Sequence, residues 1–181
     1  MRTLKDKNTD LTFISYNKED LKNQEELFNQ INSWSNDENI KRYITNDTKV
    51  NDFLLNFHNL FYSDNASHLF YTFENNQPVG VIFLTDIDLN ESIVEYIIVN
   101  PNIRGRGIGT RMIKSLTNHL EFFTDNKNIS SLTTTIDKTN IASQKAFLKN
   151  NFYELKPAHS SQLSNSKFKH FRYIKTNTPE M

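Results

Sequence analysis

Residues 99–110 read Val-Asn-Pro-Asn-Ile-Arg-Gly-Arg-Gly-Ile-Gly-Thr, and this stretch decides which fold the sequence predicts. It holds three of the chain's four glycines and joins a segment typical of a strand to one typical of a helix. Glycines at such a junction let the backbone turn tightly and let a ligand approach the main chain. Free N–H groups at the start of a helix attract anions, helped by the helix dipole. The stretch therefore predicts an anion site, with added positive charge from Arg104, Arg106, Arg111 and Lys114. The alternative is a tight loop with a solvated basic face.

The segments on either side of this loop show strand and helix patterns. Strands are expected at residues 11–16, 68–73, 79–85, 93–99, 129–136, 152–155 and 168–174. Helices are expected at residues 18–34, 48–61, 108–123 and 140–150. Short turns join the strands before the loop, which predicts an antiparallel meander. The strand–helix–strand order after it predicts a parallel pair of strands with a right-handed crossover.

One domain accounts for this order of elements. We expect a mixed α/β fold in which about four helices flank a central mixed sheet of six to seven strands. The domain is expected to span residues 11–175, preceded by a flexible N-terminal segment at 1–10 and followed by a C-terminal tail at 176–181. The 14 Phe, 7 Tyr and one Trp are enough to build its core.

The composition excludes several classes of function. Lys plus Arg and Asp plus Glu number 21 each, and this balance argues against a dedicated binder of nucleic acid or anionic membranes. The lack of cysteine excludes a disulfide framework, a thiol nucleophile and a cysteine metal site. The five histidines show no ligand spacing, so no metal is expected. The sequence shows neither a membrane-spanning apolar stretch nor a signal peptide, which favours a cytoplasmic location.

Two common phosphate-binding motifs do not fit the loop. A P-loop needs a Lys directly before its Ser or Thr, and the residue before Thr110 is Gly109. A dinucleotide fingerprint needs a third Gly after two further residues, and counting from Gly105 and Gly107 that position is Thr110. A nucleotide-binding module is therefore disfavoured.

The run Arg-Gly-Arg-Gly-Ile-Gly at 104–109 closely resembles the acetyl-CoA-binding motif of the GNAT superfamily of acyl-CoA N-acyltransferases. Residues 140–152 resemble the family's second motif, a helix that opens with Asn and closes with a Gly-Phe pair. Here the pair is Asn151-Phe152, and Asn tolerates the left-handed conformation often needed at that point. The second motif is more like that of ribosomal-protein N-terminal acetyltransferases and relatives of aminoglycoside 6′-acetyltransferases.

The resemblance implies that acetyl-CoA is the co-substrate. It also implies that backbone N–H groups around Ile97, Ile98 and Val99 bind the thioester oxygen. The other implied cofactor contacts are Arg104, Gly105, Arg106, Gly107, Ile108, Gly109, Thr110, Asn140, Ser143 and Phe147. A role of Asn140 as a helix cap alone is the alternative for that residue.

Phe147 departs from the family pattern. Many members carry at this position a Tyr that serves as the general acid, and Phe cannot donate a proton. Ser143, one turn earlier on the same helical face, is then the candidate to protonate the leaving thiolate. The departure also motivates a second hypothesis, a non-catalytic protein that binds or senses CoA.

Glu95 is the candidate general base. Ile93, Glu95, Ile97 and Val99 alternate onto one face of the expected strand, so the carboxylate lies in an apolar wall. Loss of hydration there raises the pKa of a carboxyl group toward the range useful for a base, acting directly or through water. The alternative is a Glu95 that simply faces solvent at the end of the strand.

The charges are unevenly distributed along the chain. Residues 74–103 contain acidic side chains but no Lys or Arg, and four positive charges follow within the next eleven residues. This distribution suits an anionic cofactor and a cationic amine acceptor. The leading prediction is an acetyl-CoA-dependent N-acetyltransferase that passes the acetyl group directly, in a ternary complex, to a primary amine of a small molecule or peptide. A monomer or homodimer is expected.

Overall fold

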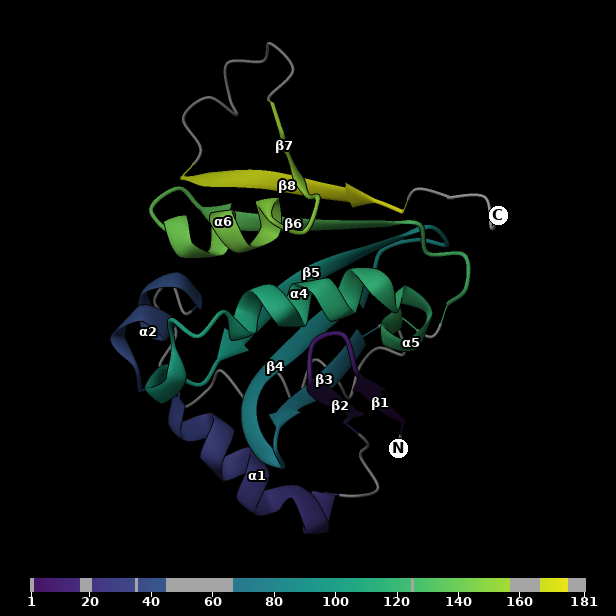
Figure 1. Ribbon diagram of the computed structural model, residues 1–181. Coiled ribbons are helices and arrows are strands. Elements are labelled where there is room, and N and C mark those ends of the chain that lie inside the picture. Colours follow the sequence, from purple (N-terminus) through teal and green to yellow (C-terminus); the bar gives the residue numbers. More distant parts are fainter. Residues whose placement is uncertain are drawn as a thin grey trace.

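The computed structural model describes residues 2–16, 21–34, 36–44, 67–124, 126–156 and 167–175. Within them, one eight-stranded sheet runs in the order β1-β2-β3-β4-β5-β6-β8-β7 (Figure 1). Its strands are β1 (Thr3–Asp6), β2 (Leu11–Ser15), β3 (Ser67–Glu74), β4 (Gln77–Asp86), β5 (Glu91–Val99), β6 (Ser131–Asp137), β7 (Tyr153–Leu155) and β8 (Phe168–Ile174). The helices are α1 (Leu21–Trp34), α2 (Glu38–Ile44), the 3-10 turn η3 (Pro101–Ile103), α4 (Ile108–Asn118), α5 (Leu120–Thr124) and α6 (Ile141–Leu148). The predicted mixed α/β fold is confirmed.

The central pairings agree with the sequence patterns. β3, β4 and β5 form the predicted antiparallel meander, and β5 pairs in parallel with β6. Asn75 and Asn76 make the turn between β3 and β4 with φ angles of 50° and 62°, a conformation that Asn tolerates better than most residues. Asn151 adopts the predicted left-handed conformation, with a φ of 64°.

Other elements differ from the expectation. The segment at 1–10, expected to be flexible, contains the edge strand β1, which pairs with β2 and brings the sheet to eight strands. The helix expected at 108–123 is divided at His119 into α4 and α5. The short helix α2 is not anticipated by the hydrophobic pattern. The helix expected at 48–61 and the tail at 176–181 lie outside the described residues.

A buried polar cluster explains why β1 is held in place. Asp6 is 4% exposed and accepts hydrogen bonds from Ser115 Oγ of α4 at 2.6 Å and from the Asn8 N–H at 2.9 Å. Thr9 Oγ1 lies 2.7 Å from Ser115 Oγ. Burial raises the pKa of Asp6, but these hydrogen bonds outweigh it and bring the pKa below its ordinary value. The charged carboxylate thus fastens the β1–β2 hairpin to α4.

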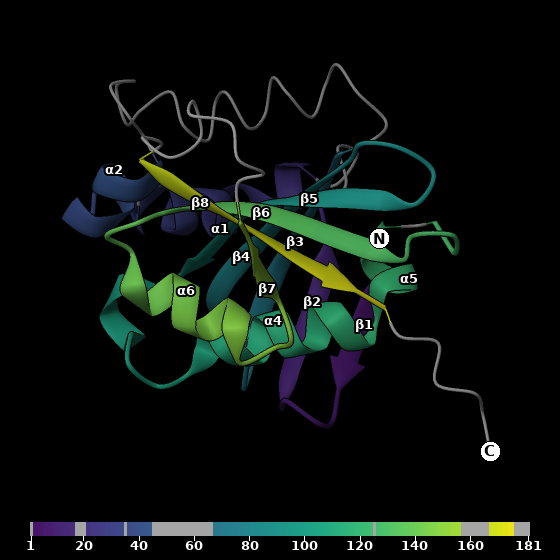
Figure 2. The ribbon, with the colours of Figure 1, turned by 90° about the horizontal axis from the view of Figure 1, so that it is seen from above.

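The sheet lies between two layers of helices (Figure 2). Helices α4, α5 and α6 cover one face, which we call the α4 face, and its core includes Met112 and Phe123. Helices α1 and α2 cover the other, which we call the α2 face, and Ile31, Trp34 and Ile40 pack there. Alternate side chains of the central strands supply the two cores.

Gly80 of β4 lets α4 lie directly on the sheet. A Cβ at this position would stand 2.6 Å from the Ile98 carbonyl oxygen and 2.8 Å from Met112 Cε. Met112 is itself fully buried, so neither neighbour has room to withdraw. Close packing at Gly80 therefore sets how near α4 comes to β4 and β5.

Replacing Gly80 with Ala is expected to lower the free energy of unfolding by about 1–3 kcal/mol, because the added methyl group overpacks the contact between sheet and helix. Urea denaturation of wild type and variant measures the difference. Gly109→Ala is the matched control, because its Cβ would meet Val99 Cγ2 at an ordinary 3.4 Å. Equal unfolding midpoints for the two variants would show that Gly80 does not set the packing distance.

Candidate active site

A β-bulge interrupts β5 at Glu95. Phe83 of β4 pairs with Tyr96, and the next residue of β4, Leu84, pairs with Val94. Glu95 therefore has no paired residue on β4. An extra residue of this kind bends its strand and reverses the alternation of the side chains that follow. The predicted strand is therefore present, but the side chains after Glu95 point to the opposite faces from those that strict alternation predicts.

The expectation that Glu95 shares a face with Ile97 and Val99 is wrong. Ile97 and Val99 pack against the core of the α4 face. Glu95 hydrogen-bonds with Thr85, and Thr85 points away from the α4 face because its neighbour Leu84 belongs to the core there. The Glu95 carboxylate therefore lies on the α2 side of the sheet.

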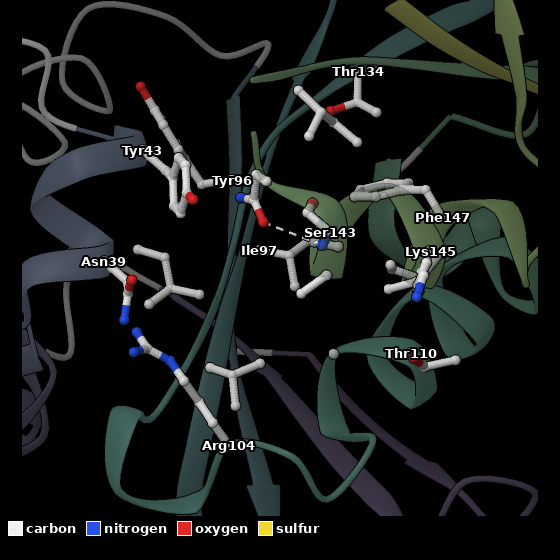
Figure 3. Close-up of a pocket in the computed structure, with 18 of the residues that line it drawn as sticks. Asn39, Tyr43, Tyr96, Ile97, Arg104, Thr110, Thr134, Ser143, Lys145 and Phe147 are labelled. Carbon is white, nitrogen blue, oxygen red and sulfur yellow. Dashed lines mark hydrogen bonds between the residues drawn. The ribbon is translucent and has the colours of Figure 1, made fainter. Parts of the chain in front are cut away.

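β5 and β6 separate just before the bulge. Their parallel pairing ends at Ile93 and Thr133, and Thr134 Oγ1 donates a 2.9 Å hydrogen bond to the Val94 carbonyl oxygen. Beyond this point a cavity of ≈ 800 Å³ lies between the two strands (Figure 3). Helix α2, the loop before α4, the first turns of α4 and the length of α6 complete its walls.

The backbone of β5 faces this cavity at alternate residues. The Asn100 N–H donates to the Val79 carbonyl oxygen of β4 at 2.9 Å. Because successive residues of a strand direct their N–H and C=O groups to opposite sides, those of Ile97 and Val99 point away from β4. On that side β6 has diverged, and both residues line the cavity. Backbone donors thus face the space in which the sequence predicts a thioester.

The glycine loop and the start of α4 close one end of the cavity. Gly105 and Gly107 have φ angles of 83° and 74°, and Gly107 is the N-cap of α4. A Cβ at either position would meet no atom within 4 Å, so the surface above both glycines is open. A backbone cradle for phosphate needs this combination. Of the predicted residues at 104–110, all but Arg106 line the cavity.

The arginines of this region are bound to carboxylates. Arg106 Nη2 and Arg111 Nη2 contact the two carboxylate oxygens of Glu74 at 2.8 and 2.6 Å. The hydrogen bond from Arg111 is the main reason that the pKa of Glu74 lies below its ordinary value. Arg104 Nη2 binds Asp37 Oδ1 at 2.7 Å. Of the acidic residues at 74–103, Glu74 is the one paired with these arginines, and the Arg106 side chain is directed at Glu74 rather than at the cavity.

Other wall residues were not anticipated from the sequence. Lys145 and Lys149 of α6 line the cavity, and Figure 3 shows Lys145 on the same side of it as Thr110. Their i, i+4 spacing places both on one side of a helix, a signal that the sequence does contain. Asn39 and Tyr43 of α2 line the opposite wall. No sequence signal marks them, because α2 itself is not predicted.

Helix α6 brings the predicted second-motif residues Asn140, Ser143 and Phe147 to the cavity. Asn140 Oδ1 accepts a 3.2 Å hydrogen bond from the Ser143 N–H, drawn dashed in Figure 3, so Asn140 caps the helix while lining the cavity. Phe147 is 4% exposed and meets Phe152 edge-on, with ring centroids 4.9 Å apart. The second motif therefore meets the glycine loop around one space.

Glu95 and Tyr96 give the α2 side of the cavity its acid–base character. Burial raises the pKa of Glu95, and the hydrogen bond with Thr85 partly opposes that rise. The Glu95 side chain is still exposed enough to be reached from the cavity. Burial also raises the pKa of Tyr96, with a smaller contribution from the negative charge of Glu95. Tyr96 therefore stays protonated at neutral pH, whereas Glu95 is suited to accept a proton.

The described histidines do not build a second centre. Among the residues that the structure describes, no three His, Asp or Glu side chains are grouped so that they could hold a metal ion. His68 Nε2 lies 3.1 Å from Asp86 Oδ2 and Ser92 Oγ donates to Asp86 Oδ1 at 2.6 Å, so His68 does not contact the Ser92 hydroxyl as a nucleophile would require. No described helix is long and apolar enough to cross a membrane.

Comparison with known proteins adds to this geometry. The spermidine N-acetyltransferase of Vibrio cholerae, solved with CoA and spermine, is 18% identical and matches 93% of this chain and 97% of its own, with a TM-score of 0.68. The N-acetyltransferase PseH of Campylobacter jejuni, solved with acetyl coenzyme A, is 15% identical over 92% of this chain and 99% of its own, with a TM-score of 0.62. RimL, a ribosomal L7/L12 alpha-N-protein acetyltransferase solved with CoA, is 14% identical over 92% and 95%, with a TM-score of 0.65.

These likenesses concern the fold. Among curated protein sequences, none matches the chain. The model of the acetyltransferase (GNAT) family matches residues 28–152, a range that contains the bulge, the glycine loop and α6. With most of its length matched in this way, the chain belongs to the GNAT family of acetyltransferases.

Proposed function

We propose that the chain binds acetyl-CoA in the cavity between β5 and β6 and transfers its acetyl group directly to a primary amine. Membership of the GNAT family makes the chain an acetyl-CoA-dependent N-acetyltransferase. What is proposed here is which residues bind the cofactor, polarise the thioester and transfer the protons. The main support for the proposal is that the open glycine loop, the backbone of Ile97 and Val99, and Glu95 all line one cavity.

The walls of the cavity suit the parts of acetyl-CoA. Backbone N–H groups at 104–110 hold the diphosphate at the start of α4, and Lys145 and Lys149 add positive charge for the cofactor's phosphates. The N–H groups of Ile97 and Val99 polarise the thioester carbonyl. Asn140, Ile98 and Phe147 line the passage between these two ends. The thioester supplies an activated acetyl group, and the chain supplies its orientation.

Glu95 removes a proton from the ammonium group of the acceptor, directly or through one water, and the freed nitrogen attacks the thioester carbon. The new C–N bond forms as the C–S bond breaks: the nitrogen gives up its second proton to solvent, and the sulfur leaves with its electron pair. We assign to Ser143 the donation of a proton to this thiolate; solvent then restores the Ser143 proton. No covalent acetyl-enzyme is needed, in keeping with a chain that contains no cysteine.

The acceptor is a small-molecule or peptide amine in this proposal. Solved structures of similar fold include a spermidine N-acetyltransferase, a ribosomal-protein N-acetyltransferase and the N-acetyltransferase PseH. The first two are named for a small-molecule amine and for a protein amine. The proposal also includes a cytoplasmic location and a monomeric or homodimeric state, although a Vibrio cholerae spermidine N-acetyltransferase of similar fold is dodecameric.

A second candidate function is binding of CoA without catalysis. Phe147 favours it, because this buried ring offers no proton where many family members have a Tyr hydroxyl. Such a protein would hold CoA tightly and release no thiol with any amine. The two candidates therefore differ in a directly measurable reaction.

Gly109→Ala tests the cofactor site. The variant is expected to fold like wild type and to bind CoA about tenfold more weakly, a loss of about 1.4 kcal/mol, because its methyl group adds bulk beside Val99 in the cavity wall. Titration calorimetry with CoA measures the affinity. Asn118→Ala, at the far end of the same helix, is the control and should bind CoA like wild type. Unchanged affinity in Gly109→Ala would place the diphosphate elsewhere.

Glu95→Gln tests the base. Its turnover is expected to fall about a hundredfold or more, because the amide cannot accept the proton. In wild type the rate should decline as pH falls through the raised pKa of Glu95, since only the carboxylate form acts as base. Thr85→Val is the matched variant: it removes the hydrogen bond that lowers this pKa, so the decline should begin at higher pH. A Glu95→Gln profile identical to wild type would remove Glu95 from the mechanism.

Phe147→Tyr separates the two candidate functions. Thiol release with a panel of amines should be retained or increased, because the change adds a hydroxyl at similar volume in the cavity wall. Phe147→Leu, which stays apolar, is the control and should show no gain. Release by the wild type supports the enzyme. Release by the Tyr variant alone would identify the natural protein as a binder of CoA.

A further inference from the structure

Asp37 joins helix α2 to the glycine loop. Its Oδ1 accepts three hydrogen bonds, from Arg104 Nη2 at 2.7 Å, from the Asn39 N–H at 3.0 Å and from the Ile40 N–H at 3.1 Å. The last two cap the first turn of α2. One carboxylate oxygen therefore starts the helix and binds an arginine that lies 67 residues away in the sequence and lines the cavity.

Helix α2 forms one wall of the cavity and contacts two loops beside it, the glycine loop and the segment between β6 and α6. Ile40 anchors it in the core of the α2 face, while Asn39 and Tyr43 line the cavity. The Tyr43 hydroxyl donates to the Thr139 carbonyl oxygen between β6 and α6, at a long 3.4 Å. Figure 3 shows Arg104 extending from the loop toward α2 beside Asn39. Of these two contacts between α2 and the neighbouring loops, the one between Asp37 and Arg104 is thus the shorter.

Arg104 has donors to spare for a second anion. A guanidinium group carries five N–H donors in a flat fork, and the contact with Asp37 uses Nη2. The side chain is 36% exposed, so its remaining edge is accessible from the cavity. Hydrogen bonding to Arg104 is the main cause of a lowered pKa at Asp37, so the carboxylate stays charged at neutral pH. The planar fork of a guanidinium lets Arg104 hydrogen-bond to the Asp37 carboxylate along one edge and to a phosphate along another.

We propose that Asp37 is a positioning residue that, through Arg104, couples the binding of acetyl-CoA to the placement of α2 over the acceptor side of the cavity. The inference rests on the cofactor site proposed above. A diphosphate on the glycine loop fixes Arg104, Arg104 fixes Asp37, and Asp37 fixes the first turn of α2. By reciprocity, an acceptor that contacts Asn39 or Tyr43 must then bind more tightly to the CoA complex than to the free protein.

Hydrogen exchange measured by mass spectrometry, with CoA as the probe, tests the coupling. In wild type, saturating CoA should slow exchange of the amides at 38–44 about tenfold, within the usual range of coupling between sites. Asp37→Asn keeps a good helix cap but removes the charge that holds Arg104, so CoA should slow exchange there less than about twofold. Glu38→Gln is the control: it breaks the exposed contact with Lys41 on the same helix and should respond like wild type.

Calorimetry on the same samples distinguishes two kinds of failure. Absence of CoA binding to wild type would overturn the proposed cofactor site and the coupling with it. CoA binding without slower exchange at 38–44, or an equal effect in Asp37→Asn, would overturn the coupling and leave the cofactor site standing. Arg104→Lys keeps a positive charge near the phosphates but loses the two-sided fork, so it should bind CoA more weakly than wild type and, at saturating CoA, lose the effect on α2.

Discussion

The bulge at Glu95 is the feature on which the site depends. By adding one residue to β5, it turns the strand so that pairing with β6 stops at Ile93 and Thr133. Three properties of the site follow from this single change in register. A cavity opens where a sheet would otherwise continue, the backbone groups of Ile97 and Val99 lose their neighbouring strand, and Glu95 leaves the ladder toward the α2 face. The proposed binding groups and the proposed base are thus placed together by one backbone irregularity.

The rest of the fold holds the glycine-loop end of that cavity in place. Gly80 brings α4 onto the sheet, and the buried carboxylate of Asp6 secures the helix from the side of the N-terminal hairpin. Glu74 then binds both Arg106 and Arg111, which fixes the loop next to the first turn of the helix. Arg106 and Arg111 hold the structure through Glu74, so in the proposed function anion recognition falls to the backbone N–H groups, to Arg104 and to Lys145 and Lys149. A cradle made of backbone needs such rigidity, because its donors cannot adjust as side chains do.

Local patterns in the sequence predict the features that depend on neighbouring residues. Glycines mark the start of α4, Asn151 marks the left-handed turn after α6, and alternation marks β3 to β5. Features that depend on distant residues are not predictable in this way. The face of Glu95 changes because β4 pairs around it, and the direction of Arg106 is decided by Glu74, 32 residues away. Short polar elements such as β1 and α2 give too few apolar positions to reveal a period.

Departure of the thiolate makes a smaller demand on the protein than deprotonation of the amine. Phe147 packs edge-on against Phe152 in the core, and a hydroxyl added there would need a polar partner. The Thr134 hydroxyl on the same side of the cavity already donates to the Val94 carbonyl oxygen. A thiol has an ordinary pKa of about 8.5, so its thiolate is a good leaving group near neutral pH and does not need to be protonated as it departs. An ammonium group with a pKa of about 10 cannot attack until a base takes its proton. In the proposed mechanism, the proton transfer that a Tyr at position 147 would provide is therefore the less demanding of the two, and Glu95 on the bulge provides the more demanding one.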